Sequence, residues 1–208
     1  YLSTLPANSI VVLHACCHNP TGADMTSDQW RTVVDIVRSR NLVAFIDMAY
    51  QGFADGIKDD AVALDLFSAS GLQFFVSSSF SKSFSLYGER VGALTIVTDS
   101  KEEASRVMSQ VKRVVRTNYS NPPTHGGAVV AAVLANPELR AQWEAELGGM
   151  RDRIRAMRVA LVAQLKESGV DQDFSFVTRQ RGMFSYTGLT AAQVERLRSE
   201  YGIYAVST

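Results

Sequence analysis

Apolar runs alternate with helical patterns along the first half of the chain. Continuous apolar segments predict strands at residues 10–15, 42–47, 72–78 and 91–97, and the first is expected to be buried on both faces. The segment from Thr26 to Gln29 has the capping-box pattern of a helix start, and apolar residues follow it at helical spacing. This alternation of strand and helix favours an α/β fold with a mostly parallel sheet flanked by helices.

Helical patterns dominate the next part of the chain. Helices are predicted over residues 101–117, over the small residues 126–134, and from Pro137 to about residue 165. The Asn-Pro-Pro sequence between the first two interrupts the helical pattern. At 1.5 Å per residue the last helix is about 45 Å long, a length suited to linking two domains.

A small α+β unit is expected after this long helix, which Ser168 and Gly169 bring to an end. Strand-like runs occupy residues 174–178 and 183–186. A helix is predicted from about Thr190, and a last strand over residues 202–206.

Composition narrows the classes of protein that the chain can belong to. It has 208 residues, 46% of them hydrophobic, with 21 basic and 21 acidic side chains. This length is enough for one sizeable core and a small second domain. The balanced charge argues against binding to nucleic acid or to a membrane surface. No apolar run approaches the roughly 18 to 20 residues of a transmembrane span.

The two cysteines and the first residue carry further expectations. Cys16 and Cys17 are adjacent, so we expect buried, reduced thiols of a cytoplasmic protein rather than a disulfide or a metal site. The chain begins at Tyr1, directly before a strand, and ends just after another strand-like run. We therefore expect it to be an internal piece of a longer protein.

One lysine stands among hydroxyl side chains in the run from Ser77 to Arg90. An amine with a cationic neighbour loses its proton more readily and can attack a carbonyl carbon, as a Schiff-base lysine does. The hydroxyls, together with Arg90, suit a phosphate group. Lys82 beside such a phosphate site suggests pyridoxal 5'-phosphate. The alternative is a serine-rich loop with a solvated lysine.

Polar residues also follow the first two predicted strands. Asn19, Asp47 and Lys82 each lie at or just beyond the carboxyl end of a strand, where parallel sheets bind ligands, so the three could converge. Asn19, Asp47 and the nearby Tyr50 have plainer interpretations as well: Asn19 suits a turn before proline, Asp47 suits a helix cap, and Tyr50 suits a packed core aromatic.

Four motifs in this order closely resemble class I (fold type I) pyridoxal-phosphate aminotransferases, and most of all the aspartate and aromatic amino acid aminotransferases. They are His18–Gly22, Asp47–Phe53, the lysine run Ser77–Arg90, and Arg116–Pro123. Gln180–Gly188 extends the resemblance, which covers essentially the whole chain. It implies the fold of those enzymes. In that fold residues 1–136 are part of the large cofactor-binding domain, 137–168 the interdomain helix, and 169–208 part of the small domain.

The resemblance implies roles around the cofactor ring. Asp47 would pair with the protonated pyridine nitrogen, and a buried carboxylate keeps such a nitrogen cationic. Asn19 and Tyr50 would hydrogen-bond the phenolic oxygen. Lys82 would form the Schiff base and then move a proton at the substrate. Lys82, Asp47 and Tyr50 are thus the expected catalytic residues.

The resemblance also implies phosphate-binding and substrate-binding residues. Ser79, Ser81 and Arg90 would hold the cofactor phosphate, the arginine through two parallel hydrogen bonds. Arg116 would cross a homodimer interface to receive the side-chain carboxylate of a dicarboxylic substrate. Asn121 would lie near the substrate carboxylate or the ring. Without the resemblance, Arg116 would be interpreted as a solvated arginine at a helix end.

The implied reaction is a ping-pong transfer of an amino group between an aromatic or dicarboxylic amino acid and a 2-oxo acid, usually 2-oxoglutarate. The 208-residue piece alone is expected to be weakly active or inactive, because parts of the family's site lie outside it. Three alternatives stay open: a lyase of the same fold, the aminotransferase-like sensor domain of a transcription regulator, and an ordinary α/β domain. The histidines His14, His18 and His125 are assigned no chemistry.

Overall fold

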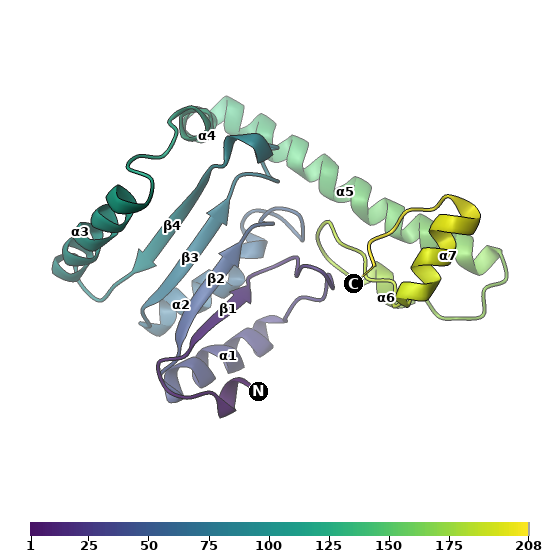
Figure 1. Cartoon of the computed structure of the whole chain (residues 1–208), viewed down its shortest axis with the longest axis horizontal. Helices are drawn as coiled ribbons and strands as arrows, with labels where there is room; N and C mark the ends of the chain where they lie inside the picture. Colours follow the sequence, from purple (N-terminus) through teal and green to yellow (C-terminus); the bar gives the residue numbers. More distant parts are fainter. Residues whose placement is uncertain (208) are drawn as a thin grey trace.

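The computed structural model describes residues 1–207, and its centre is a four-stranded sheet (Figure 1). Strands β1, β2 and β3 run parallel in this order, and β4 pairs with β3 antiparallel. They comprise Ile10–His14, Val43–Met48, Phe74–Ser79 and Gly92–Val97 respectively. The predicted mostly parallel α/β sheet is therefore confirmed.

The strand register brings the carboxyl ends of three strands together. His14 lies opposite Asp47 across β1 and β2, and Asp47 lies opposite Ser77 across β2 and β3. Because parallel strands end at one edge of a sheet, the segments that follow them share that edge. This edge positions the candidate site.

Helices α1 (Ser27–Ser39) and α2 (Val62–Ser70) pack on one face of the sheet. The predicted capping box starts α1: the Thr26 side chain accepts from the Gln29 amide, and the Gln29 side chain accepts from the Thr26 amide. Between helices and sheet lies the core, whose largest fully buried side chains include Trp30, Ile46, Met48, Phe67 and Phe74. Helix α2 was not among the predicted elements.

The other face of the sheet is more open, and the expectation that β1 is buried on both faces is wrong. Ile10 and Val12 are 69% and 65% exposed, because no helix of the described chain covers their side of this edge strand. Phe45 and Phe75 stack on this face with ring centroids 5.8 Å apart. Helix α3 (Lys101–Asn118) lies beyond β4 and borders an apolar groove of about 1010 Å³.

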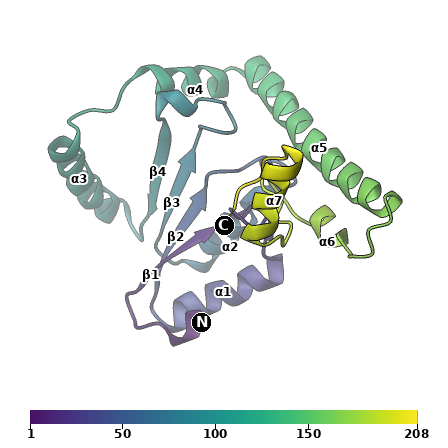
Figure 2. The ribbon, with the colours of Figure 1, turned by 45° about the vertical axis from the view of Figure 1, so that its right-hand side comes forward.

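Two further helices lead away from the sheet. Helix α4 (His125–Ala135) precedes α5 (Pro137–Glu167), whose 31 residues span about 46 Å. Asn136 caps α5 by accepting from the amides of Glu138 and Leu139. Figures 1 and 2 show α5 running from α4, above the sheet, to α6 (Ser175–Thr178) and α7 (Ala191–Tyr201).

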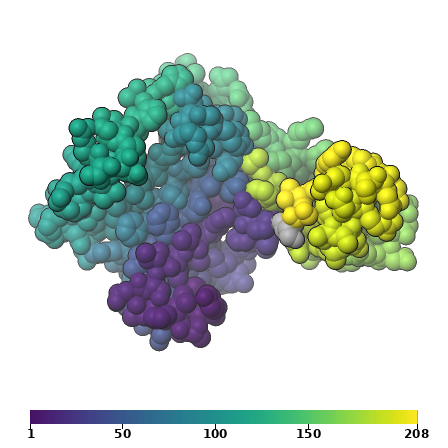
Figure 3. Space-filling model, viewed as in Figure 1, coloured from purple at the N-terminus to yellow at the C-terminus, as the bar shows by residue number. Residues whose placement is uncertain are grey.

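The strands predicted after α5 are not formed, so this part of the prediction is wrong. Residues 175–178 form helix α6, while 183–186 and 202–206 have no strand assignment. An apolar run becomes a strand only where a neighbouring chain pairs with it, and none does so in the described residues. The helix expected from Thr190 is confirmed as α7. Figure 3 shows this C-terminal part as a lobe to one side of the sheet.

Short 3-10 helices complete the described chain: η1 (Leu2–Thr4), η2 (Asp59–Ala61) and η3 (Tyr87–Glu89). Within residues 1–207, no helix is both long and apolar enough to cross a membrane.

Candidate active site

The carboxylate of Asp47 marks the end of β2 at the shared edge of the sheet. Its Oδ1 accepts a hydrogen bond of 2.9 Å from the Ala49 amide, and its Oδ2 lies 3.8 Å from Nε2 of His14. The side chain is 31% exposed, so it is accessible to a ligand at this edge. The apolar run before Asp47 forms the strand, and the turn after it holds the carboxylate in place.

Asn19 and Tyr50 come from separate loops and meet over this edge. The Asn19 side-chain amide donates to the Tyr50 hydroxyl at 3.2 Å, and the Asn19 backbone N–H donates to Nδ1 of His14 at 3.2 Å. Tyr50 is buried, with its ring edge-on to that of Phe184 at 5.6 Å. The loops after β1 and β2 are therefore locked together through the two predicted ligands of a phenolic oxygen.

Lys82 reaches the same place from the turn that follows β3. Its Nζ lies 4.6 Å from the centroid of the Tyr50 ring, a favourable position for a cation over an aromatic face. The turn closes through the Ser85 amide, which donates to the Lys82 carbonyl at 3.1 Å. Asn19, Tyr50 and Lys82 thus form one connected group.

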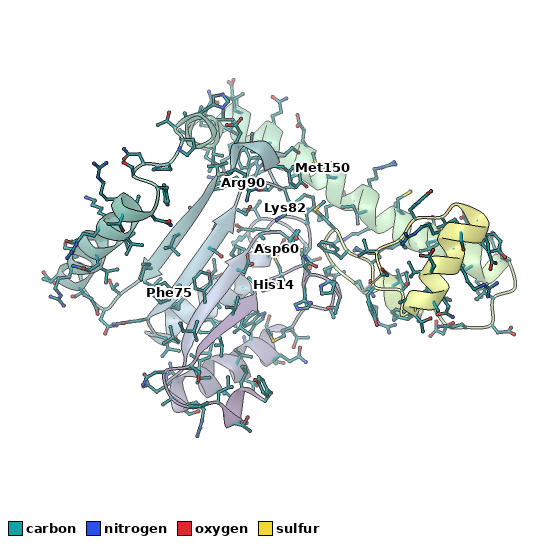
Figure 4. All side chains as sticks on the ribbon, in the orientation of Figure 1. His14, Asp60, Phe75, Lys82, Arg90 and Met150 are labelled. Carbon is teal, nitrogen blue, oxygen red and sulfur yellow. The ribbon has the colours of Figure 1, made fainter. Side chains whose placement is uncertain are left out.

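The predicted phosphate ligands flank this lysine. Ser79 is the last residue of β3, and its hydroxyl accepts from the amide of the buried Ser81 at 3.2 Å. Arg90 adopts a left-handed backbone conformation at φ 51°. Within the described residues its guanidinium has a single hydrogen bond, from Nη1 to the Tyr87 carbonyl at 3.1 Å. Figure 4 shows Arg90 and Lys82 at the end of the sheet that faces α5.

Arg116 and Asn121 are not brought to this group. Arg116 lies exposed in the last turn of α3 and donates to the Ser120 hydroxyl. Asn121 lies exposed in the loop after α3, with its amide bonded to the Tyr119 carbonyl at 2.9 Å. In the described part of the chain, neither side chain has a hydrogen bond to the lysine turn. Seven of the nine predicted site residues therefore gather at one edge, and these two lie apart.

Asp60 supports the loop that carries Tyr50, and the sequence reasoning missed it. Its buried carboxylate accepts four backbone hydrogen bonds, from the amides of Gly52, Ala54, Asp55 and Gly56, at 2.7 to 3.2 Å. The sequence offered one signal, which is an acidic pair at the start of a helical pattern. That signal indicates a helix start and does not show that the carboxylate binds a preceding loop.

Arg158 on α5 is a second residue that was missed. It is only 4% exposed and donates to the carbonyl groups of Gln180, Gly182 and Phe184 and to the Ser185 hydroxyl. Burial lowers the pKa of its guanidinium, although an arginine stays protonated. By fixing this segment, Arg158 holds Phe184 against Tyr50. An arginine within a helical pattern gives no sign of such a role.

The two cysteines lie buried directly after β1, and both are free thiols, as expected. A hydrogen bond with Cys17, together with burial, raises the pKa of the Cys16 thiol far above its usual range. Their sulfur atoms and the Asp60 carboxylate lie within 4.8 Å of one another. Of this group, the Asp60 carboxylate already accepts the four amides of the loop that carries Tyr50.

A family model and curated relatives match this chain over its whole length. The family model "Aminotransferase class I and II" matches residues 1–208. An aspartate aminotransferase of Pseudomonas aeruginosa is 69% identical over 207 residues, which are 100% of this chain and 52% of that protein. An aromatic-amino-acid aminotransferase of Escherichia coli is 54% identical over the same shares. The chain thus spans about half the length of these relatives.

A solved structure of a similar protein has the same fold as this chain. The aromatic-amino-acid aminotransferase of Burkholderia pseudomallei, covalently bound to pyridoxal phosphate, superposes with a TM-score of 0.98 at 68% identity. The match covers 99% of this chain and 52% of that one. With the family model, this likeness shows that the chain belongs to the class I and II aminotransferase family.

Proposed function

We propose that this chain is part of a pyridoxal-phosphate-dependent aminotransferase. The enzyme would move an amino group between an aromatic or dicarboxylic amino acid and a 2-oxo acid such as 2-oxoglutarate. One observation carries the proposal: the Lys82 amine lies over the Tyr50 ring, at the edge where Asn19 and Asp47 also lie. Relatives named as aspartate and aromatic-amino-acid aminotransferases support both substrate classes.

The residues at this edge fit the three polar parts of pyridoxal phosphate. Lys82 supplies an amine for the aldehyde, and the accessible Asp47 carboxylate would pair with the pyridine nitrogen. Asn19 and Tyr50, already joined through the tyrosine hydroxyl, would hydrogen-bond the phenolic oxygen. A carboxylate beside a ring nitrogen stabilises its protonated form, and donors to the phenolic oxygen stabilise its anion.

The phosphate would bind next to the lysine turn. Ser79 and Ser81 contribute hydroxyls from the end of β3, and Arg90 contributes a guanidinium whose described hydrogen bond uses only Nη1. A planar guanidinium matches two phosphate oxygens with two parallel hydrogen bonds. The left-handed backbone of Arg90 ends η3 and sets the direction in which this side chain leaves the loop.

The chain's own chemical step is a proton transfer by Lys82. When bound, pyridoxal phosphate supplies an electron sink for the electron pair released at the substrate Cα. The Lys82 amine would take the proton from the substrate Cα and would deliver it to the carbon that carried the aldehyde of the cofactor. The Tyr50 ring lies 4.6 Å from the amine and would help to hold it at this edge of the sheet.

Arg116 is proposed to serve the site of a second copy of the protein. It lies exposed on α3, apart from the Lys82 turn, and so is available to bind a carboxylate outside this chain's own site. The proposal therefore includes a homodimer with shared sites, with Asn121 near the bound substrate. We further propose the division into residues 1–136, 137–168 and 169–208, and a cytoplasmic location in keeping with the free thiols.

Activity of the full-length protein tests this function. Aspartate, tyrosine and phenylalanine are each supplied with 2-oxoglutarate, and glutamate formation is followed. Lys82→Ala should abolish it, while Lys112→Ala, a change at an exposed lysine of α3, should leave it near the wild-type rate. Equal rates for the two variants would refute the catalytic role of Lys82. A wild-type protein that releases product without amino transfer would favour the lyase alternative.

A further inference from the structure

Helix α5 contacts three segments at the candidate site: two that carry site residues and one that packs against Tyr50. Arg151 and Arg155 donate to carbonyl groups of the loop after Tyr50, and Arg158 binds the segment that contains Phe184. A third contact, made by Trp143, reaches the turn of Lys82 itself. Trp143 therefore contacts the two residues that follow the reactive lysine in the chain.

Trp143 contacts the turn immediately after Lys82 through a hydrogen bond and through ring stacking. Its indole Nε1–H donates to the carbonyl oxygen of Ser83 at 2.7 Å. Its ring stacks on that of Phe84, with centroids 4.5 Å apart and planes inclined by 23°. The hydrogen bond fixes the peptide between Ser83 and Phe84, and the stack fixes the Phe84 side chain. Phe84 in turn meets Phe80 edge-on at 5.5 Å, so the contact spans the whole turn.

Cavities lie on both sides of this contact. One of about 360 Å³ is lined by Ser83, Phe84 and Trp143 together with residues of α4 and α5. Another of about 190 Å³ is lined by the same three residues and by Ser79 and Phe80. Close packing therefore does not enclose the turn, and the Trp143 side chain bridges the space between helix and turn.

We propose that Trp143 is a positioning residue for Lys82, which couples α5 to the orientation of the reactive amine. This inference rests on the proposed function, since the amine is useful only if it acts on a cofactor. A shift of α5 would be passed through the indole to the Ser83 carbonyl and the Phe84 ring, and hence to the peptide of Lys82. Without the bridge, the turn would open more often and Lys82 would leave the Tyr50 ring.

The decisive experiment measures how readily Lys82 is acetylated in the cofactor-free, full-length protein. A trace of acetic anhydride is added, and mass spectrometry gives the ratio of acetylation at Lys82 to that at the exposed Lys112 of α3. Trp143→Phe keeps a stacking ring and removes the indole donor, whereas Trp143→Leu removes both. Trp30→Phe is the matched control, because it alters the buried tryptophan of the α1 core.

Loss of one hydrogen bond should raise the acetylation ratio by about 2- to 12-fold in Trp143→Phe. Trp143→Leu should raise it further, and Trp30→Phe should leave it unchanged even if thermal stability falls. An unchanged ratio in Trp143→Phe, or an equal rise in Trp30→Phe, would overturn the positioning role. Trp143→Phe alone decides the matter if Trp143→Leu does not fold.

A parallel reaction separates this inference from the proposed function. The same proteins are loaded with pyridoxal phosphate and reduced with borohydride, and the modified lysine is identified. Modification of Lys82 in the wild type, with less of it in Trp143→Phe, supports both ideas. Normal modification with an unchanged acetylation ratio overturns only the role of Trp143. Failure to modify Lys82 in the wild type overturns the proposed function and the inference with it.

Discussion

Replacing Asp60 with asparagine tests how the loop that carries Tyr50 is held. Each carboxylate oxygen accepts two backbone N–H groups: Oδ1 those of Asp55 and Gly56, and Oδ2 those of Gly52 and Ala54. An asparagine keeps one acceptor oxygen and puts an NH₂ group, itself a donor, in place of the other. Two backbone N–H groups then face a donor in a buried site.

The expected cost follows from these contacts. A buried donor left without an acceptor costs about 1–3 kcal/mol, so two of them cost about 2–6 kcal/mol. That is a large share of the roughly 5–15 kcal/mol by which a typical domain is stable. Because Gly52 follows Tyr50 closely, the loosened loop should also weaken retention of the cofactor.

Urea unfolding of the full-length protein, followed by circular dichroism, gives the change in the free energy of unfolding. Asp59→Asn is the control, since this neighbouring carboxylate is exposed, and its effect should stay within about 0.5 kcal/mol. If Asp60→Asn unfolds at the same urea concentration as Asp59→Asn, the four amides do not depend on the charge, and the argument fails.

Three further changes test other contacts. Gly182→Ala directs a methyl group into Cys17 and should lower the free energy of unfolding in urea by about 3 kcal/mol or more. Gly188 has a similar φ and open space around it, so Gly188→Ala should cost only about 1–2 kcal/mol. Arg158→Met leaves three backbone carbonyl groups without their donor and should lower the unfolding midpoint by an amount that corresponds to about 3 kcal/mol; a midpoint like the wild type's would contradict the buried role. The pKa of the Cys16 thiol is raised in the folded state above its unfolded value of 9.0. Its contribution to the free energy of unfolding is therefore intact below pH 9.0 and is lost above that pH, by up to about 1.4 kcal/mol per pH unit. Cys16→Ala should lack this decline, and an identical pH dependence of unfolding would refute the assignment.

The strands of the sheet and helix α1 could be predicted because their signals are local. Thr26 and Gln29 specify a helix start between themselves, and a continuous apolar run that ends in Asp47 specifies a buried strand and its end. The positions of Asn19, Asp47 and Lys82 at strand ends followed from the parallel order. The register brings the ends of β1, β2 and β3 to one edge, where Asn19 and Lys82 both lie against Tyr50. The antiparallel return of β4 has no signal within its own residues.

The parts that were not predicted depend on partners distant in the sequence. Residues 183–186 alternate like a strand, but no segment of the described chain pairs with them. Arg158 binds the Phe184 carbonyl and the Ser185 hydroxyl instead. The roles of Arg158 and Trp143 arise from contacts across the fold, which no periodicity encodes. Asp60 binds a nearby loop, but its carboxylate reaches those amides only once the loop has turned back toward it. The expected burial of β1 failed because a strand's second face depends on what packs against it.

Chemical trapping of the reactive lysine tests the central claim most directly. The full-length protein is incubated with pyridoxal phosphate, reduced with borohydride and digested, and the modified residue is located by mass spectrometry. The account predicts a single phosphopyridoxyl group, on Lys82, which reaches the edge of the sheet beside Tyr50 and Asn19. A folded protein in which Lys82 stays unmodified, or in which another lysine carries the group, would contradict it.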